Sequence, residues 1–212
     1  MNLDEKIISA LKDLDYKEAT EIQKKAIPIA LKKRDILAAA QSGTGKTAAF
    51  LLPILTELIA NKQPNKPVLR TLILVPTREL ASQISKAAED LGKYLDVQKL
   101  AVFGGVSTKE QEKKIAKGLD ILVATSGRLM EHLKNGTVDL SSVTTVVIDE
   151  VDTMLDMGFL EDIEKILPSV GPKRQIMMFS ATMNQNVKKL AKEFLTDPVV
   201  IEVAQQRSAV KI

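Results

Sequence analysis

The sequence predicts one α/β domain built on a mostly parallel β-sheet with helices on both faces. Short runs of β-branched and other apolar residues alternate with longer amphipathic segments along almost the whole chain, which is the pattern of a doubly wound sheet. A loop of small residues, AQSGTGKT at 40–47, and an acidic segment, VVIDEVD at 146–152, each follow an apolar run. Because ligands bind at the carboxyl ends of the strands in such sheets, we expect both segments at one edge.

Composition bounds the class of protein. The 212 residues, 45% apolar and 27% charged, suffice for one domain with a sizeable core. We expect no membrane span, because no run of about 18 apolar residues is present, and no secretory signal, because the N-terminus is acidic and amphipathic. The absence of cysteine excludes disulfides and thiolate metal sites and suits a reducing cytoplasm. A net charge of +3 is too small to indicate nucleic-acid binding by itself.

The expected elements follow from periodicity and from turn residues. Two N-terminal helices, at 4–14 and 20–32, precede the sheet core at 33–205, and Pro28 is expected to end or kink the second helix. The clearest loop is NKQPNKP at 61–67. Strands are expected at 36–40, 70–76, 97–103, 120–125, 144–150, 174–182 and 199–203, and further helices at 48–59, 77–95, 108–117, 127–135, 158–167 and 184–195.

The loop at 40–47 has the composition of a phosphate-binding loop. Gly43 and Gly45 let the backbone turn so that successive N–H groups converge on phosphate oxygens at a helix N-terminus. Lys46 would reach the β- and γ-phosphates, and Thr47 would offer its hydroxyl to Mg²⁺. The first position, usually Gly, is Ala40, and a chance turn is the alternative interpretation. Nucleotide contacts are assigned to the whole loop, Ala40, Gln41, Ser42, Gly43, Thr44, Gly45, Lys46 and Thr47.

The acidic segment supplies the other half of such a site. Asp149, directly after a buried strand, can hold Mg²⁺, and Glu150 can orient and deprotonate an attacking water. Two solvated acids at a strand end are the alternative. Together the two segments predict a nucleoside triphosphate site with magnesium, with Lys46, Asp149 and Glu150 as catalytic residues. Kinases, GTPases, transport ATPases and helicases remain open at this point.

Further motifs occur in one order around these two segments. They are YKEATEIQKKAIP at 16–28, PTRELA at 76–81, FGG at 103–105, TSGR at 125–128 and SAT at 180–182. With them the chain resembles the DEAD-box ATP-dependent RNA helicases over essentially its whole length, and specifically the first of that family's two RecA-like domains. The resemblance implies a RecA-like P-loop NTPase fold that uses ATP and Mg²⁺. It also implies that ATP hydrolysis drives RNA duplex unwinding together with a second RecA-like domain, for which no motif follows residue 182.

The resemblance also assigns residues. Gln23 would read the adenine edge, although an exposed helix residue is the alternative, and Tyr16 would lie near the adenine or pack the two N-terminal helices together. An ion pair with Glu79 is the alternative for Arg78, and a tight turn is the alternative for Gly104–Gly105. RNA contacts are implied for Pro76, Thr77, Arg78, Glu79, Gly104, Gly105, Thr125, Gly127 and Arg128, and coupling of nucleotide state to domain closure for Asp152, Ser180 and Thr182.

Some positions depart from the family pattern. Val151 replaces Ala, Ala19 replaces Pro, and Ser126 replaces a Pro and is expected to loosen its loop. Asp15 stands where Gly is usual, at a helix C-terminus that favours positive φ. His132, the only histidine, is expected on a helix surface without a role.

The expected partners are single-stranded or duplex RNA and the second RecA-like domain, and the chain alone is expected to be monomeric and nearly inactive. A DNA helicase of the same superfamily and a non-catalytic RNA-binding module remain as alternatives, with a metabolic kinase further off.

Overall fold

A computed structural model of the chain describes residues 3–62 and 67–203. Most of the loop expected at 61–67, and the last residues of the sheet core expected at 33–205, lie outside these residues. None of the helices in the described part combines the length and hydropathy that a membrane span needs.

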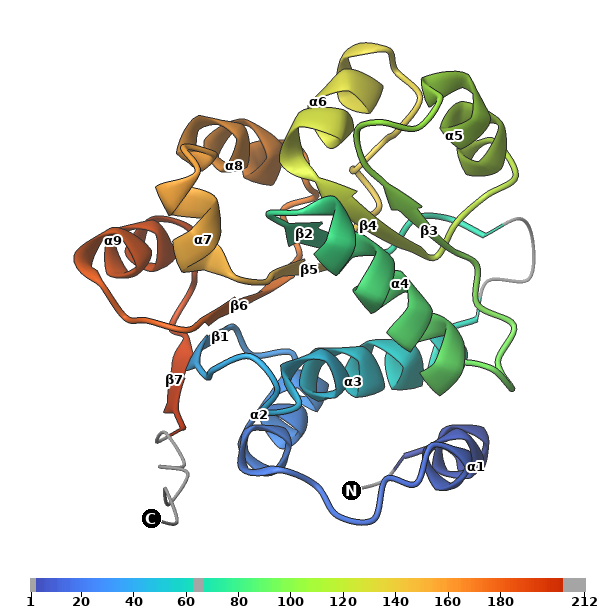
Figure 1. Cartoon of the computed structure of the whole chain (residues 1–212), viewed down its shortest axis with the longest axis vertical. Helices are drawn as coiled ribbons and strands as arrows, with labels where there is room; N and C mark the ends of the chain where they lie inside the picture. The colour runs from blue at the N-terminus through green and yellow to red at the C-terminus, as the bar shows by residue number, and fades with distance from the viewer. Residues whose placement is uncertain (1–2, 63–66, 204–212) are drawn as a thin grey trace, which may run out of the picture.

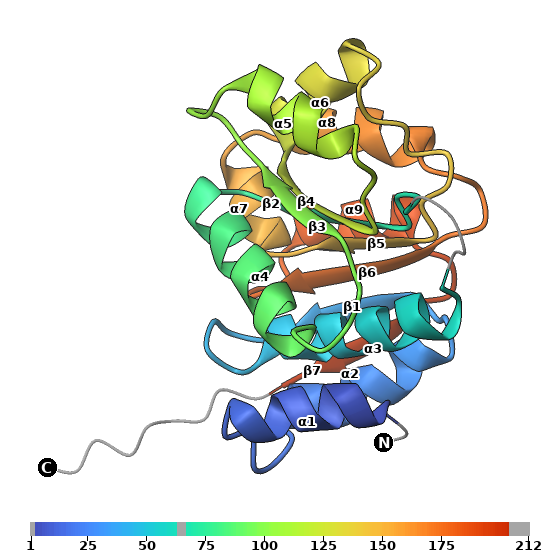
Figure 2. The ribbon, with the colours of Figure 1, turned by 90° about the vertical axis from the view of Figure 1, so that its right-hand side faces the viewer.

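The described residues form one seven-stranded sheet, in which every neighbouring pair is parallel. The spatial order is β3-β4-β2-β5-β6-β1-β7. All carboxyl ends therefore point to one side, at the left in Figure 2 and toward the viewer in Figure 1. The strands are β1 (Ile36–Ala39), β2 (Thr71–Val75), β3 (Lys99–Val102), β4 (Ile121–Thr125), β5 (Thr145–Ile148), β6 (Gln175–Ser180) and β7 (Val199–Glu202).

Helices cover both faces of the sheet, and each face has its own apolar core (Figure 2). Alternation along the central strands divides their side chains between the two cores, as period-2 geometry requires: Ile73 and Val147 face one, Leu74 and Ile148 the other. The first face carries α1 (Glu5–Asp13), α2 (Glu21–Leu31), α3 (Lys46–Ala60) and α4 (Arg78–Leu91). The second carries α5 (Thr108–Ile115), α6 (Ser126–Lys134), α7 (Val151–Asp156), α8 (Leu160–Ile166) with the short 3₁₀ turn Leu167–Ser169, and α9 (Gln185–Phe194).

The predicted fold class is confirmed, and each expected strand is present. Two helical details differ. Pro28 lies inside α2 without ending it; its neighbours Ile27 and Ala30 are buried in the core shared with α3, and this packing outweighs the lost hydrogen bond. The helix α7 was not predicted, because six residues directly after an acidic strand end carry too little periodicity to reveal it.

The departures from the family pattern are accommodated. Asp15 has φ 57°, so the Asp occupies the left-handed conformation expected there. Val151 is fully buried in the second core. The loosening expected at Ser126 is not seen: this side chain is buried, and its hydroxyl donates to Asp162 Oδ2 at 2.8 Å.

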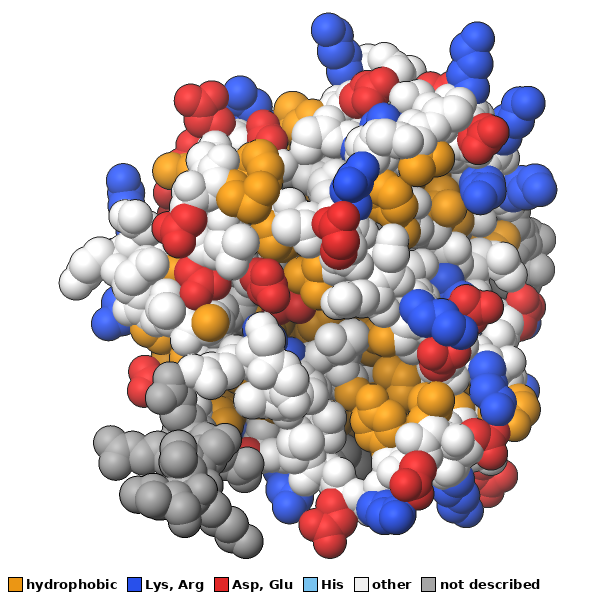
Figure 3. Space-filling view, viewed as in Figure 1, with side chains coloured by type: hydrophobic (Ala, Val, Ile, Leu, Met, Phe, Trp, Pro, Cys, Tyr) orange, Lys and Arg blue, Asp and Glu red, His pale blue; other side chains and the backbone are white. Residues whose placement is uncertain are grey.

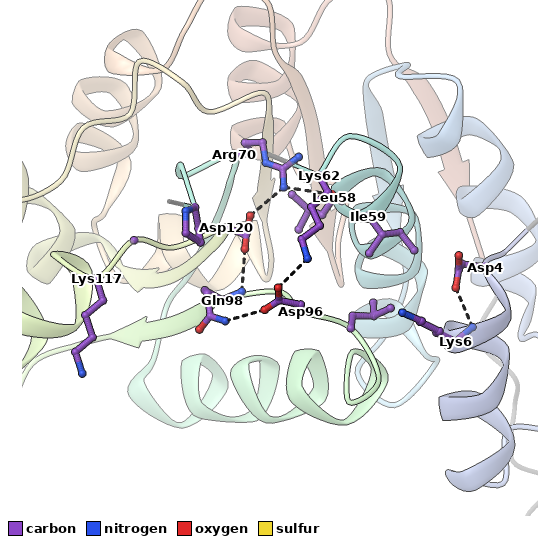
Figure 4. Close-up of a pocket in the computed structure, with 13 residues that line it drawn as sticks. Asp4, Lys6, Leu58, Ile59, Lys62, Arg70, Asp96, Gln98, Lys117 and Asp120 are labelled. Carbon is purple, nitrogen blue, oxygen red and sulfur yellow. Dashed lines mark hydrogen bonds and ion pairs between the residues drawn. The ribbon is translucent and has the colours of Figure 1, made fainter. Parts of the chain in front are cut away.

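A buried ion pair ties the opposite, amino edge of the sheet together (Figure 4). Arg70 Nη2 lies 2.9 Å from Asp120 Oδ1, and Arg70 Nη1 donates to the Asn61 carbonyl at the end of α3. The other Asp120 oxygen accepts from Gln98 N–H at 2.8 Å. The starts of β2, β3 and β4 are thereby fixed relative to α3, the helix that carries the phosphate-binding loop at its other end.

Arg70→Ala should destabilise the domain by about 3 kcal/mol, because it leaves Asp120 buried without its counter-charge. Urea unfolding followed by circular dichroism measures this. Arg34→Ala is the matched control: it breaks the exposed pair with Asp197 and should cost less than about 1 kcal/mol. Equal effects of the two variants would contradict the role of the amino-edge pair.

Candidate functional site

The phosphate-loop segment turns sharply between β1 and α3. Gly43 and Gly45 have φ of 80° and 92°, which L side chains rarely adopt. A Cβ on Gly45 would also lie 2.5 Å from Gln23 Nε2 and 2.9 Å from Thr20 Oγ1, so no side chain fits there. The Thr44 hydroxyl donates to the Gln41 carbonyl at 2.6 Å and closes the exposed tip of the loop.

Lys46 and Asp149 meet at the carboxyl edge, from segments that follow β1 and β5. Their side chains are 6% and 3% exposed, and Lys46 Nζ lies 3.7 Å from Asp149 Oδ1. At that distance Nζ has no hydrogen-bond partner among the described residues. Burial raises the pKa of Asp149, and the Lys46 charge and the Glu150 N–H only partly oppose this. Two buried charges without full hydrogen bonding are costly, and an anion at Lys46 and a cation at Asp149 would each relieve that cost.

Glu150 holds a strained conformation beside this pair. Its φ and ψ are 53° and 50° at the N-cap of α7, a left-handed conformation that costs a non-glycine residue about 1 kcal/mol. The Glu150 N–H donates to Asp149 Oδ1 at 2.9 Å. Strain of this kind clusters at functional sites, and here it falls on the residue directly after Asp149, whose side chain is partly exposed.

Gln23 contacts the phosphate loop directly. It is buried rather than exposed; its Nε2 donates to the Gly45 carbonyl at 3.1 Å and its Oε1 accepts from Thr20 N–H at 3.0 Å. Tyr16, in contrast, is 47% exposed in the segment between α1 and α2. The structure therefore joins the amide of Gln23 to the loop and leaves Tyr16 on the surface.

Asp152 connects the acidic segment to the end of β6. Thr182 donates to Asp152 Oδ2 through both its N–H, at 3.0 Å, and its hydroxyl, at 3.1 Å. Burial acts to raise the pKa of Asp152, but the surrounding hydroxyl and N–H donors outweigh it and hold the pKa below its usual range. The fully buried Ser180 hydroxyl also lowers the pKa of Asp152, although its geometry falls short of a hydrogen bond to any of the described residues.

A shallow groove runs along the same edge over β2, β3 and β4. Arg78 is 61% exposed, and its pairing with Glu79 at 3.5 Å is an exposed contact that is worth little. Thr77 caps α4 by accepting from Leu80 N–H at 3.2 Å. On the face that looks onto this edge, acidic and basic side chains are interspersed, with Lys and Arg gathered over α5 (Figure 3). The groove is lined by Pro76, Thr77, Arg78, Glu79, Gly104, Thr125, Ser126, Gly127, Arg128, Glu131, Met157 and Phe159.

Comparison with known proteins identifies the family. Residues 20–190 match the DEAD/DEAH box helicase family. The chain belongs to this family. It is 43% identical over 204 residues to the DEAD-box ATP-dependent RNA helicase RhpA of Helicobacter pylori, covering 96% of this chain and 40% of that protein. The match to the CshA helicase of Bacillus subtilis is 38% over 209 residues, 99% of this chain and 42% of that protein.

The fold agrees with a solved member of the family. A DEAD box protein from the hyperthermophile Methanococcus jannaschii superposes with a TM-score of 0.89 at 35% identity, over 96% of this chain and 55% of that one. The chain thus spans about 40% of the length of the curated relatives and corresponds to the N-terminal DEAD domain.

Two polar residues of this DEAD domain, Arg128 and His132, are more buried than the sequence suggests. The Arg128 side chain is 10% exposed and its Nε pairs with Glu131 at 2.9 Å. His132, expected on a helix surface, is fully buried; its Nδ1 lies 2.9 Å from Thr137 Oγ1 and its Nε2 lies 3.1 Å from Gln111 Oε1. The helix containing His132 lies between α5 and α8, a packing that periodicity within α6 does not show.

Sequence reasoning missed Gln111. This residue lies on the polar helix α5 but is 4% exposed, and its amide contacts Phe103, Arg128 and His132. A glutamine among the charged residues of TKEQEKKI gives no signal of burial, so only the packed structure reveals it. Met157 and Phe159, on the α7–α8 connection, were also missed as groove residues.

The site's donors fit magnesium. Asp149 and Thr47 offer hard oxygen ligands of the kind that Mg²⁺ takes alongside phosphates and water. The described residues contain no group of three His, Cys, Asp or Glu side chains that could hold a metal ion.

His132 should make the domain less stable in mild acid. Burial first, and then the Arg128 charge, lower the pKa of His132, while Glu131 and Glu112 oppose this. The unfolded chain therefore binds the proton more readily, and stability is lost as the pH falls below the ordinary histidine pKa of about 6.5. Between about pH 7.5 and 5.5, the wild type should lose up to about 1 kcal/mol more stability than His132→Gln in urea unfolding. Equal losses would show that His132 accepts a proton freely in the folded domain.

Proposed function

We propose that this DEAD-box domain is the ATP-binding half of an ATP-dependent RNA helicase. The observation that carries the proposal is the buried pair of Lys46 and Asp149 at the carboxyl edge, 3.7 Å apart and without full hydrogen bonding. Membership of the family implies the use of ATP; the magnesium ion, the RNA and the coupling between them are proposed here.

In the nucleotide site, Lys46 would exchange its weak contact with Asp149 for the β- and γ-phosphates, and backbone N–H groups of the loop would bind the remaining oxygens. A magnesium ion held by Asp149 and Thr47 would neutralise phosphate charge. That ion would also favour the ionised form of Asp149, which burial disfavours. Gln23 already donates to the Gly45 carbonyl and would bind adenine, so a change in the loop would change the adenine contact.

Glu150 is the proposed general base. The proposal is supported by its position directly after Asp149, by its left-handed backbone and by its partial burial, which leaves the side chain open to a water molecule. A carboxylate there can orient the attacking water and accept its proton. The contacts of Asp152 with Thr182 would carry changes at the acidic segment to the end of β6.

The groove is the proposed site for one side of an RNA strand. Arg78 is exposed and free to exchange Glu79 for a phosphate, while Gly104, Gly105, Thr125 and Gly127 offer backbone and hydroxyl donors. Such contacts position a strand without reading its sequence. Pro76 is buried. Arg128 contributes to the groove indirectly, by donating to the Val106 carbonyl in the loop after β3.

The other functions considered are less well supported. Intact Lys46, Asp149 and Glu150 weigh against a non-catalytic RNA-binding module, and the family weighs against a metabolic kinase. A DNA helicase differs only in the strand that the groove accepts, and a contact to the 2′-hydroxyl is what distinguishes the two.

The chain alone should hydrolyse ATP very slowly, and RNA should not stimulate it. Charge on the γ-phosphate in the transition state needs an arginine finger, whose contribution is about 10³–10⁵ in rate and which we assign to the second RecA-like domain. Steady-state ATPase assays of this chain and of a version joined to such a domain, with and without single-stranded RNA, measure the difference. Stimulation by RNA should appear only in the two-domain version.

Two controls sharpen this test. Lys46→Ala in the two-domain version should abolish turnover, and a DNA strand of matched sequence should stimulate less than RNA. RNA-stimulated turnover by this chain at the two-domain rate would refute the half-site proposal, and equal stimulation by DNA would favour the DNA helicase.

A further inference from the structure

One buried side chain joins the segments that line the groove. The Gln111 amide donates from Nε2 to the Phe103 carbonyl at 3.2 Å and accepts at Oε1 from Arg128 Nη1 at 2.9 Å. Arg128 Nη1 also donates to the Val106 carbonyl at 2.9 Å. Gln111 and Arg128 thus tie both ends of the 103–106 loop to the start of α6.

The same loop passes against Arg78. Gly105 has φ 83°, and a Cβ there would lie 3.0 Å from Arg78 Nη1. The loop therefore lies beside the exposed guanidinium of Arg78. Gln111 thus holds the segment after β3 and, through Arg128, the segment after β4, and both lie next to the segment after β2.

We propose that Gln111 is a positioning residue for RNA, which preforms the groove through Phe103 and Arg128 without touching the strand. The inference rests on the proposed RNA-binding function of the groove. It assigns to α5, which carries none of the recognised motifs, a part in RNA affinity.

His132 fixes which way the amide points. Its Nε2 lies 3.1 Å from Gln111 Oε1, and an oxygen there can only accept, so Nε2 carries the proton. With two donors, Arg128 and His132, on one side and the Phe103 carbonyl on the other, only one orientation of the amide satisfies every partner. A carboxylate at position 111 could not donate to Phe103, and an apolar side chain could make none of these contacts.

Preformation matters because one side of the groove, the 103–106 segment, is a loop between β3 and α5. The amide fixes this loop before RNA arrives, so the strand does not have to order it, and ordering costs affinity. Loss of Gln111 should therefore weaken RNA binding and leave the nucleotide site unchanged, because that site lies further along the carboxyl edge, at β5, β6 and β1.

The test is fluorescence anisotropy of the chain with a labelled oligouridine strand at low salt, together with calorimetry for Mg·ADP. Gln111→Leu should raise the RNA Kd about fivefold, the usual effect of losing one such hydrogen-bonded unit, with the ADP Kd unchanged. Gln175→Leu is the matched control: Gln175 is equally buried, at 4% exposed, and donates to the Ala30 and Arg34 carbonyls at the amino edge. It should lower stability without changing the RNA Kd.

A double-mutant cycle separates positioning from general destabilisation. If Gln111 acts through Arg128, then Gln111→Leu combined with Arg128→Met should weaken RNA binding no more than the stronger single variant. Additive losses, an unchanged RNA Kd in Gln111→Leu, or an equal loss in Gln175→Leu would each overturn the inference. Arg78→Ala tests whether RNA binds in the groove. If Arg78→Ala weakens RNA binding and Gln111→Leu does not, the proposed function stands and the role of Gln111 is overturned. If the wild type binds no RNA, the proposed function and the role of Gln111 are both overturned.

Discussion

The arrangement of this domain centres on two opposite charges buried at one edge of the sheet. Lys46 and Asp149 follow β1 and β5, which flank β6, and both are almost inaccessible to water. Burying two charges costs several kcal/mol unless contacts of good geometry offset it, and a separation of 3.7 Å does not provide them. The free energy stored there favours any ligand that separates the pair and supplies each charge with a better partner.

The surrounding structure holds this unfavourable pair in place. Gly45 packs against Gln23 and Thr20 too closely to admit a side chain, which anchors the phosphate loop to the N-terminal helices. On the other side, Asp149 accepts from the strained Glu150, and Asp152 is bonded to Thr182. The amino-edge pair of Arg70 and Asp120 holds the far end of α3.

The sequence predicted those features that depend on the residue pattern within a single segment. The central strands are short continuous apolar runs, typical of a parallel sheet buried on both faces, and the motifs place their polar residues at strand ends. The fold and the proximity of Lys46 to Asp149 could therefore be expected. The predictions that failed concern residues whose surroundings are made by contacts between distant segments. His132 is buried because α6 packs among other helices, Gln111 because three partners converge on it, and Pro28 remains helical because α3 covers α2. None of these leaves a periodic signal in its own segment.

The most direct test of the central claim is a crystal structure of the chain with Mg²⁺ and ADP. The account predicts that Lys46 Nζ moves to within about 3.2 Å of a β-phosphate oxygen and away from Asp149, whose carboxylate turns to the metal side. The Gly45 carbonyl should keep its bond to Gln23. A structure in which Lys46 stays paired with Asp149 while the phosphates bind elsewhere would contradict it.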